Sequence, residues 1–448
     1  MADQLSARDV LRIRDFRRLW LGQLVSEAGD GLTNLTLLLL VNHLTGSTAA
    51  IAAMAIVLAV PPLTVGLVAG AYVDRADRRR IMLASDLLRA GTVLGFILVG
   101  SADWLWLLFI LAFTQATVGT FFTPARGAIL PRIVPTEGLL AANSIAQATR
   151  VVSSILGAGL GGLLIGLIGV YWPAFVIDAL TFLASFAFIV GLPASVGRVT
   201  QAAGGVATGL RASLLAGLRT IGRSRLLATT ILALAVCMLG LGAVNVLFVP
   251  LLVDVLRVGP AWFGPVELAQ SSSMILAAGL VGTLANRLGA TRIVAGGLAA
   301  IAVVIGLLAA VTEIWHVLVL MFVAGWFVAP FQAAVVTVLQ TNAADAERGR
   351  VMAVLQAAMS ASSVLSMAFA GIVGEVVGVR NVFLTAALIV AAGAVVAVLG
   401  YRGRRPAVRA ASVPGSEDGP GSEDGPAARD GSGPAPVPAG PATAVPID

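Results

Sequence analysis

The sequence predicts an all-α polytopic membrane protein in which twelve transmembrane helices form two pseudo-symmetric six-helix bundles. Three observations favour this fold class. Of the 448 residues, 58% are hydrophobic and only 12% are charged, whereas soluble domains carry about 25% charged residues. The charged residues leave long apolar stretches between them. A short motif of glycine and polar residues also occurs twice, at equivalent places in the two halves of the chain.

The uncharged stretches are long enough to cross a bilayer. A membrane-spanning helix needs about 20 mostly apolar residues, and the stretch 31–73 holds two such helices with a turn at 42–47. We predict spans at 19–42, 49–73, 81–101, 104–124, 141–168, 171–193, 226–253, 262–285, 292–311, 315–341, 350–375 and 379–401.

The arginines predict how these spans are oriented. All 29 basic residues are arginines, and 25 of them lie in the two tails or in loops on the side of the tails. The opposite loops hold only Arg257 and Arg380. Because positively charged loops stay in the cytoplasm, we expect a multi-pass protein of the plasma membrane with both termini cytoplasmic.

The composition also excludes several classes of function. Without a lysine the chain cannot hold an ordinary ATP-binding P-loop, so uphill transport would draw on an ion gradient or a partner. The single cysteine, Cys237, excludes disulfides and cysteine metal sites. The sequence offers no nucleophile–base pair or metal-ligand cluster, and its arginines lie in short loops. We therefore expect no enzyme activity, no cofactor and no nucleic-acid partner.

The repeated motif divides the chain into two bundles. Gly70-x-x-x-Asp74-Arg75 closes the second span, and Gly282-x-x-x-Asn286-Arg287 closes the eighth. The longest internal connector lies between the sixth and seventh spans. We predict a cytoplasmic N-terminal segment, a first bundle, a cytoplasmic connector, a second bundle and a cytoplasmic tail, at 1–18, 19–193, 194–225, 226–401 and 402–448. The tail repeats GSEDGP at 415–420 and 421–426 and is rich in proline and glycine, which predicts disorder.

The loop after the second span resembles the signature of the major facilitator superfamily, Gly-x-x-x-Asp-Arg-x-Gly-Arg-Arg. Asp77 stands in the place of the second glycine, and the matching positions are Gly70, Asp74, Arg75, Arg78 and Arg79. Segments 15–32, 121–144 and 177–186 are most similar to the drug-efflux branch with macrolide and enterobactin exporters. The resemblance covers 15–401 and implies the major facilitator fold, with a central site between the bundles.

The resemblance has two local implications. The sequence GAGLGG at 157–162 is similar to an antiporter signature, with Ala158 in place of its proline, and its matching glycines allow close helix contact; they are Gly157, Gly161 and Gly162. The resemblance also implies that Asp74 faces the start of the eleventh span and latches the cytoplasmic side. Alternatively, the neighbouring arginines only enforce topology and bind anionic lipid.

Ionisable residues inside a span are costly and usually face an interior or a cavity. One face of the first span carries Gln23, Glu27, Asp30 and Asn34, and one face of the fifth carries Asn143, Gln147, Arg150 and Ser154. Glu27 and Asp30 lie on the order of 13 and 18 Å beyond Arg18, and Arg150, counted from Ala141, lies at a depth similar to that of Glu27. We hypothesise that one of these acids titrates during transport beside Arg150. The alternative is a permanent ion pair, or an acid capped by amides; Asp86 and Arg89 are expected to form a structural pair.

Other polar residues in the spans are candidates for the lining of a central cavity, although each could equally make a helix–helix hydrogen bond. They are Gln115, Asn245, Glu267, Gln270, Gln332 and Gln356. We expect the cavity to be apolar with a few polar groups, which suits amphipathic or hydrophobic cargo. We expect a monomeric, proton-coupled exporter of the drug or siderophore class, surrounded by membrane lipid. A lipid or lysolipid translocator and a non-transporting scaffold or receptor remain alternatives.

Overall fold

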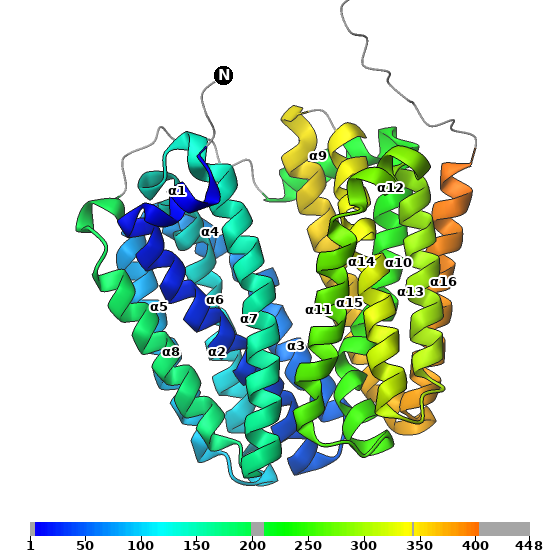
Figure 1. The fold of residues 1–448 in the computed structure, drawn as a ribbon, viewed down its shortest axis with the longest axis horizontal. Coiled ribbons are helices and arrows are strands. Elements are labelled where there is room, and N and C mark those ends of the chain that lie inside the picture. Colours follow the sequence, from blue (N-terminus) through cyan, green and yellow to red (C-terminus); the bar gives the residue numbers. More distant parts are fainter. Residues whose placement is uncertain (1–4, 199–209, 343–344, 403–448) are drawn as a thin grey trace, which may run out of the picture. The chain divides into compact units, whose positions relative to one another are not determined.

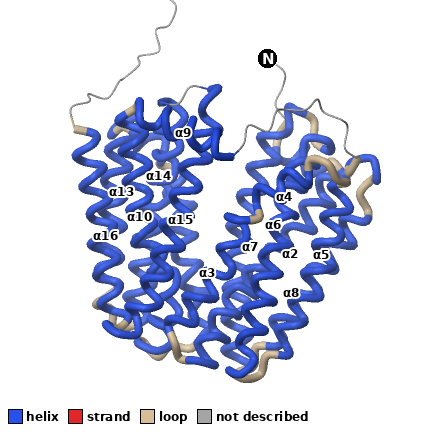
Figure 2. Tube along the Cα trace, turned by 180° about the vertical axis from the view of Figure 1, so that it is seen from behind, coloured by secondary structure: helices blue, strands red, loops and turns tan. Residues whose placement is uncertain are grey.

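Helices account for all the regular structure in the described part of the chain (Figures 1 and 2). The computed structural model describes residues 5–198, 210–342 and 345–402. Its α-helices are α1 (Ala7–Arg12), α2 (Arg14–Thr45), α3 (Thr48–Thr64), α4 (Gly66–Val73), α5 (Arg78–Gly95), α6 (Leu105–Ile133), α7 (Leu139–Ile168), α8 (Trp172–Val190), α9 (Leu210–Arg223), α10 (Arg225–Pro250), α11 (Phe263–Ala278), α12 (Val281–Leu288), α13 (Ala290–Leu308), α14 (Ile314–Asn342), α15 (Asp345–Val377) and α16 (Val379–Tyr401).

Within these residues, 10 helical segments are long and apolar enough to cross a membrane. The two other expected spans, 49–73 and 262–285, are each divided into a pair of shorter helices. Helices α3 and α4 meet at Val65, and α11 and α12 are separated by Gly279 and Leu280. Two prolines in the last turn of α3 lack the N–H that an α-helix needs, which favours the first break. The multi-pass helical fold is confirmed, and the count of twelve stays a prediction.

The long helices form two groups (Figure 1). In the first group, α2 packs against α7 and α8, and α5 against α6 and α8. In the second, α10 packs against α15 and α16, and α13 against α14 and α16. The groups meet where α3 lies against α15 and where α7 lies against α11. These two pairs of helices are therefore the joints between the groups.

The contacts between the groups lie at one end of the helices. We call the end with the N-terminus the N-terminal face and the other end the opposite face (Figure 1). A Cβ on Gly162, near the end of α7, would lie 2.3 Å from the backbone oxygen of Pro260. A Cβ on Gly371, near the end of α15, would lie 2.4 Å from Cβ of Ala52. Backbone thus meets backbone or small side chains at the opposite face, which is the closed end.

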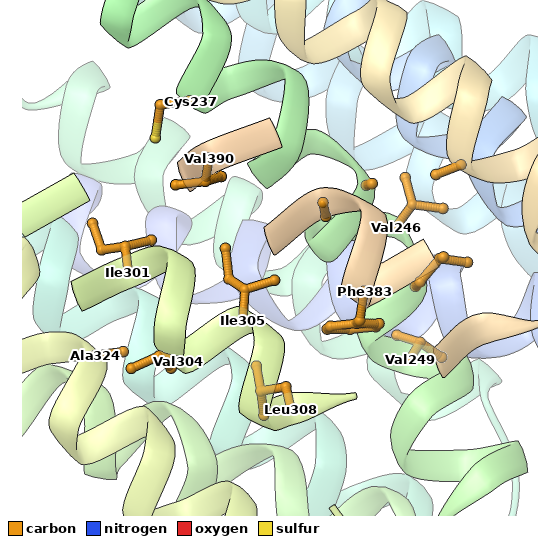
Figure 3. Close-up of a cluster of buried hydrophobic side chains, with 14 of the residues drawn as sticks. Cys237, Val246, Val249, Ile301, Val304, Ile305, Leu308, Ala324, Phe383 and Val390 are labelled. Carbon is orange, nitrogen blue, oxygen red and sulfur yellow. The ribbon is translucent and has the colours of Figure 1, made fainter. Parts of the chain in front are cut away.

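The second group has an apolar core between α10, α13 and α16 (Figure 3). Cys237, Ile305, Phe383 and Val390 are at most 3% exposed and pack in one cluster. Among helices in lipid, tight packing rather than removal from water holds such a cluster together. Cys237 therefore fills space in the core and is out of reach of solvent.

The connector contains a helix that the sequence analysis did not predict. Helix α9 occupies the end of 194–225, and its Gly217 packs against Val354 and the backbone of Arg350 in α15. Residues 199–209 of the connector lie outside the described residues, and so does the predicted tail beyond Arg402. The boundaries predicted for the two bundles stay predictions.

Candidate functional site

An ion pair between α2 and α5 lies inside the first group. Nη2 of Arg89 donates to Oδ1 of Asp30, and the two side chains are 11% and 30% exposed. The guanidinium carbon of Arg89 lies 4.1 Å from the ring centroid of Phe182 in α8. Stacking on an aromatic ring is favourable for a guanidinium. This contact with α8 therefore helps to fix the position of Arg89, and Asp30 is the more exposed partner of the ion pair.

A second ion pair joins α2 to α6 one turn closer to the N-terminal face. Nη1 of Arg126 lies 2.7 Å from Oε1 of Glu27 and 2.8 Å from Oε1 of Gln23. Both charged side chains are 20% exposed. Helix α6 continues through Pro124 to Ile133, which places Arg126 within the helix. The stripe predicted on the first span therefore faces two arginines from other helices.

Neither of these arginines is the one that the sequence analysis proposed. Arg150 is exposed on α7, and Asp30 and Glu27 pair with Arg89 and Arg126 instead. The pairing of Asp30 or Glu27 with Arg150 is thus corrected. Asp86 and Arg89, expected to form a structural pair, make no direct hydrogen bond or ion pair among the described residues, because Arg89 donates to Asp30 and Asp86 is fully buried.

A cavity of about 620 Å³ lies beside the first ion pair. Its charged lining residues are Asp30 and Arg89. The remaining lining residues are Asn34, Leu58, Pro62, Gly66, Gln115, Ala116, Gly119, Thr120, Thr123 and Pro124. Gln115 is buried, and its Oε1 accepts from the hydroxyl of Thr92 at 2.5 Å. Half of the lining residues are polar or charged, and polar groups that converge on a cavity are typical of small-molecule sites.

A smaller cavity of about 190 Å³ adjoins the second ion pair. It is lined by Glu27, Arg126, Gln23, Asn143 and Thr149, together with Phe16, Leu19, Trp20, Thr123, Gly127, Leu130 and Ala146. Thr123 lines both cavities. Asp30 and Glu27 can therefore both be reached from neighbouring spaces within the first group.

The other predicted cavity residues are not part of these two cavities. Glu267 of α11 is half-buried and accepts from the hydroxyl of Ser154 of α7 at 3.1 Å, across the joint between the groups. The backbone carbonyl of Gln270 lies where a Cβ on Gly325 of α14 would be. Four side chains are exposed on their helices: Gln147, Asn245, Gln332 and Gln356.

The charged loop after α4 is anchored to its own group. Arg79 donates to the backbone oxygens of Ile189 at 3.2 Å and Val190 at 2.7 Å, and Arg78 to that of Ala128 at 3.3 Å. Helix α8 ends at Val190, and a cation is favourable at a helix C-terminus. The loop is therefore held by carbonyl groups of α6 and α8.

The two acids of this loop, Asp77 and Asp74, lie in different surroundings. Asp77, which replaces the signature glycine, is the N-cap of α5 and accepts from the N–H of Arg80 at 3.0 Å. Asp74 and Arg75 are exposed, and a Cβ on Gly70 would meet nothing within 4 Å. The contact expected between Asp74 and the eleventh span is not made among the described residues, so the latch stays a prediction.

The glycines of α7 lie at helix crossings. A Cβ on Gly157 would lie 2.6 Å from the backbone oxygen of Ala28 and 2.8 Å from Cα of Gly31, both in α2. A Cβ on Gly161 would lie 3.4 Å from the backbone oxygen of Leu32. Gly162 faces the second group. Helix α7 thus packs closely on both sides, without the proline of the antiporter signature.

Comparison with known protein families shows which family the chain belongs to. Residues 6–425 match the family described as transmembrane secretion effector. The chain belongs to this family of major facilitator transporters. The resemblance expected from the loop after the second span is thereby confirmed, as is its drug-efflux branch.

Several relatives of this family have names that state an activity. The multidrug efflux pump Tap of Mycobacterium tuberculosis (strain ATCC 25618 / H37Rv) is 30% identical over 405 residues, which cover 86% of this chain and 92% of Tap. The macrolide efflux protein A of Streptococcus pyogenes is 28% identical over 151 residues, which cover 33% of this chain and 37% of that protein.

Solved structures show the same fold at low sequence identity. A point mutant of the nucleoside transporter NupG aligns with a TM-score of 0.71 at 13% identity, covering 87% of this chain and 100% of that chain. A bacterial homologue of the iron transporter ferroportin in an inward-facing state aligns with a TM-score of 0.69 at 14% identity, covering 87% and 99%. The all-helical transporter fold is therefore shared with both.

Proposed function

We propose that the chain is a secondary transporter that exports amphipathic or hydrophobic small molecules of the drug or siderophore class by proton antiport. The observation that carries this proposal is the Asp30–Arg89 pair in the wall of a cavity of about 620 Å³. An accessible carboxylate inside a membrane-spanning helix is costly and is typical of a proton or substrate pathway. The efflux relatives support the outward direction.

The pair offers a mechanism for coupling. While Asp30 is charged it holds Arg89, and the ion pair is neutral as a whole. Protonation of Asp30 removes the carboxylate charge that faces Arg89 from α2 and leaves Arg89 beside the buried Asp86 and Asp178, which favours a different arrangement of α2 and α5. Cargo in the same cavity would meet these two states with different affinity. Only such a difference in affinity lets one ligand drive the other.

The closed opposite face supports transport by alternating access. We infer twelve spans in two pseudo-symmetric bundles, with the divided helices α3–α4 and α11–α12 as the second and eighth spans. With both termini cytoplasmic in the plasma membrane, the closed opposite face is external. This state then corresponds to one open toward the cytoplasm, from which an exporter loads its cargo. We expect the monomer, in contact with lipid, to be the transporting unit.

Flux in proteoliposomes tests the proposal. Purified protein would be reconstituted, a pH gradient imposed, and the movement of a fluorescent dye, a macrolide, a siderophore and a lysolipid measured. We expect gradient-driven flux of at least one of the first three, reduced at least tenfold by Asp30→Asn and unchanged by Asp103→Asn, which alters an exposed acid between α5 and α6. Movement of lysolipid alone, or of no cargo, would contradict the proposal. So would flux that Asp30→Asn leaves intact.

A further inference from the structure

A carboxylate of the second group reaches the first turn of a helix in the first group. Glu375 lies near the end of α15, and its Oε1 accepts from the hydroxyl of Ser47 and from the N–H of Ala49 at 3.3 Å. Ser47 is the N-cap of α3, the 17-residue helix that begins at Thr48. The contact therefore joins the two groups at the opposite face.

The start of α3 is a favourable place for this charge. The first four N–H groups of a helix have no partner within it, and its N-terminus carries a partial positive charge. The hydroxyl of Ser47 accepts from the N–H of Ala50 at 3.2 Å. Glu375 also accepts from the N–H of Ala49. The start of α3 is therefore capped twice, once by Ser47 and once by a residue of the other group.

The surrounding contacts hold the carboxylate in position. The hydroxyl of Thr48 donates to the backbone oxygen of Gly371 at 3.1 Å, and Gly371 packs on Ala52 without a side chain between them. Another cross-group hydrogen bond, from Asn42 to Asp254 at 3.2 Å, ties the end of α2 to the segment after α10. Glu375 thus belongs to the set of contacts that closes the opposite face.

The other ends of the same two helical segments show the reverse arrangement. There the segment α3–α4 ends at Val73 and is followed by Asp74, while α15 begins at Asp345. Each segment therefore has a carboxylate at or near its C-terminal end, at the end where the other has its N-terminus. At the opposite face this contact is made. At the N-terminal face Asp74 is exposed, and its side chain makes no hydrogen bond or ion pair with the described residues.

We propose that Glu375 is the latch of the opposite face and that it alternates with the latch that the family resemblance implies for Asp74, so that a carboxylate caps the facing helix only at the closed end. This rests on the proposed function in assuming that the protein alternates between two states. Loss of the contact between Glu375 and the start of α3 would favour opening of the opposite face. Formation of a contact between Asp74 and the start of α15 would favour closure of the N-terminal face. Each latch is a single charge on a helix terminus, weak enough to be broken in every cycle.

Distance measurements between spin labels test the latch without any cargo. Labels would be placed through Trp172→Cys in the first group and Ala310→Cys in the second, both exposed near the opposite face. The background would be Cys237→Ser. Double electron–electron resonance on the full chain in nanodiscs then reports the closed and open populations of that face.

The two carboxylates should shift these populations in opposite directions. We expect Glu375→Gln to raise the ratio of open to closed opposite faces about fivefold, the effect of losing one such charge at a helix terminus. Ser47→Ala should shift the ratio in the same direction, and the double variant should add little to Glu375→Gln. Asp74→Asn should lower the ratio, whereas the control Asp103→Asn should leave it unchanged. Opposed shifts are not expected from general loss of stability.

The results that would overturn the latch are equally specific. If Glu375→Gln and Ser47→Ala both match the parent distribution, Glu375 does not hold the opposite face. If Asp74→Asn has no effect or shifts the ratio the same way as Glu375→Gln, the alternation is wrong. If Glu375→Gln does not give monodisperse protein, the ratio of open to closed opposite faces measured for Ser47→Ala decides the question. Absence of flux in proteoliposomes would defeat the proposed function while leaving these distances to decide the latch.

Discussion

Arg126 of α6 lies 2.7 Å from Glu27 of α2, inside the helix group and not in the loop after the fourth span. The contact requires α6 to continue as a helix past Pro124. Arg126 also donates to the amide oxygen of Gln23, so a single guanidinium bonds one oxygen on each of two residues of the same stripe. The charge of Glu27 is thereby balanced within the membrane.

Removing the arginine of this pair should be more harmful than removing both partners. We expect Arg126→Gln to lower stability by about 3 kcal/mol, the low end of the range for an unpaired charge, because both side chains are 20% exposed. The double variant Glu27→Gln/Arg126→Gln should recover most of this loss. Thermal unfolding in detergent, followed by the loss of monodisperse protein, measures both. As a control, Arg12→Gln breaks a pair of 83% and 46% exposed side chains and should change little. A double variant no more stable than Arg126→Gln would argue against the pair.

Close packing of α7 on α2 predicts an effect of a single methyl group. Gly157→Ala places a Cβ within 2.8 Å of Cα of Gly31, so the helices must move apart. We expect a loss of about 1–3 kcal/mol in the same thermal assay. Gly127→Ala in α6 meets no atom within 4 Å and should be neutral or slightly stabilising, because alanine favours a helix. Equal effects of the two substitutions would mean that the crossing is less tight than described.

The N-cap of α5 gives a third prediction. Asp77→Ala removes the acceptor for the N–H of Arg80 and should cost about 1 kcal/mol, whereas Asp77→Gly, which restores the family residue, should cost only a few tenths. Thermal unfolding of the two variants side by side provides the comparison. If alanine were tolerated as well as glycine, Asp77 would not be acting as a cap.

The sequence predicted most of the spans and the polar face of α2 because both depend on local pattern. Apolar length identifies a span, and a spacing of three or four residues places Gln23, Glu27 and Asp30 on one face. The partners of that face depend on the packing of other helices, which a spacing within one helix does not contain. Depth alone could have indicated Arg89, since it lies about 16 Å along α5 from Arg78, similar to Asp30 along α2.

Two expectations failed for identifiable physical reasons. The fourth span was predicted at 104–124, but α6 continues to Ile133, since a proline is tolerated within a helix in a membrane. Arg126 was therefore left outside the predicted span. Arg150 was chosen because its depth matched Glu27, yet its side chain is exposed on α7. Equal depth is thus necessary for a pair but does not decide which face of a helix points inward.

The two prolines of α3 have a consequence for the hydration of the larger cavity. Pro61 and Pro62 have no N–H to offer the carbonyl groups of Val57 and Leu58, one helical turn earlier. Leu58 and Pro62 line the cavity, and lipid cannot satisfy a backbone acceptor. We therefore expect ordered water at this point of α3 when the cavity is empty. Cargo that binds there must displace that water or share it, and a hydroxyl or amide donor would be the natural replacement.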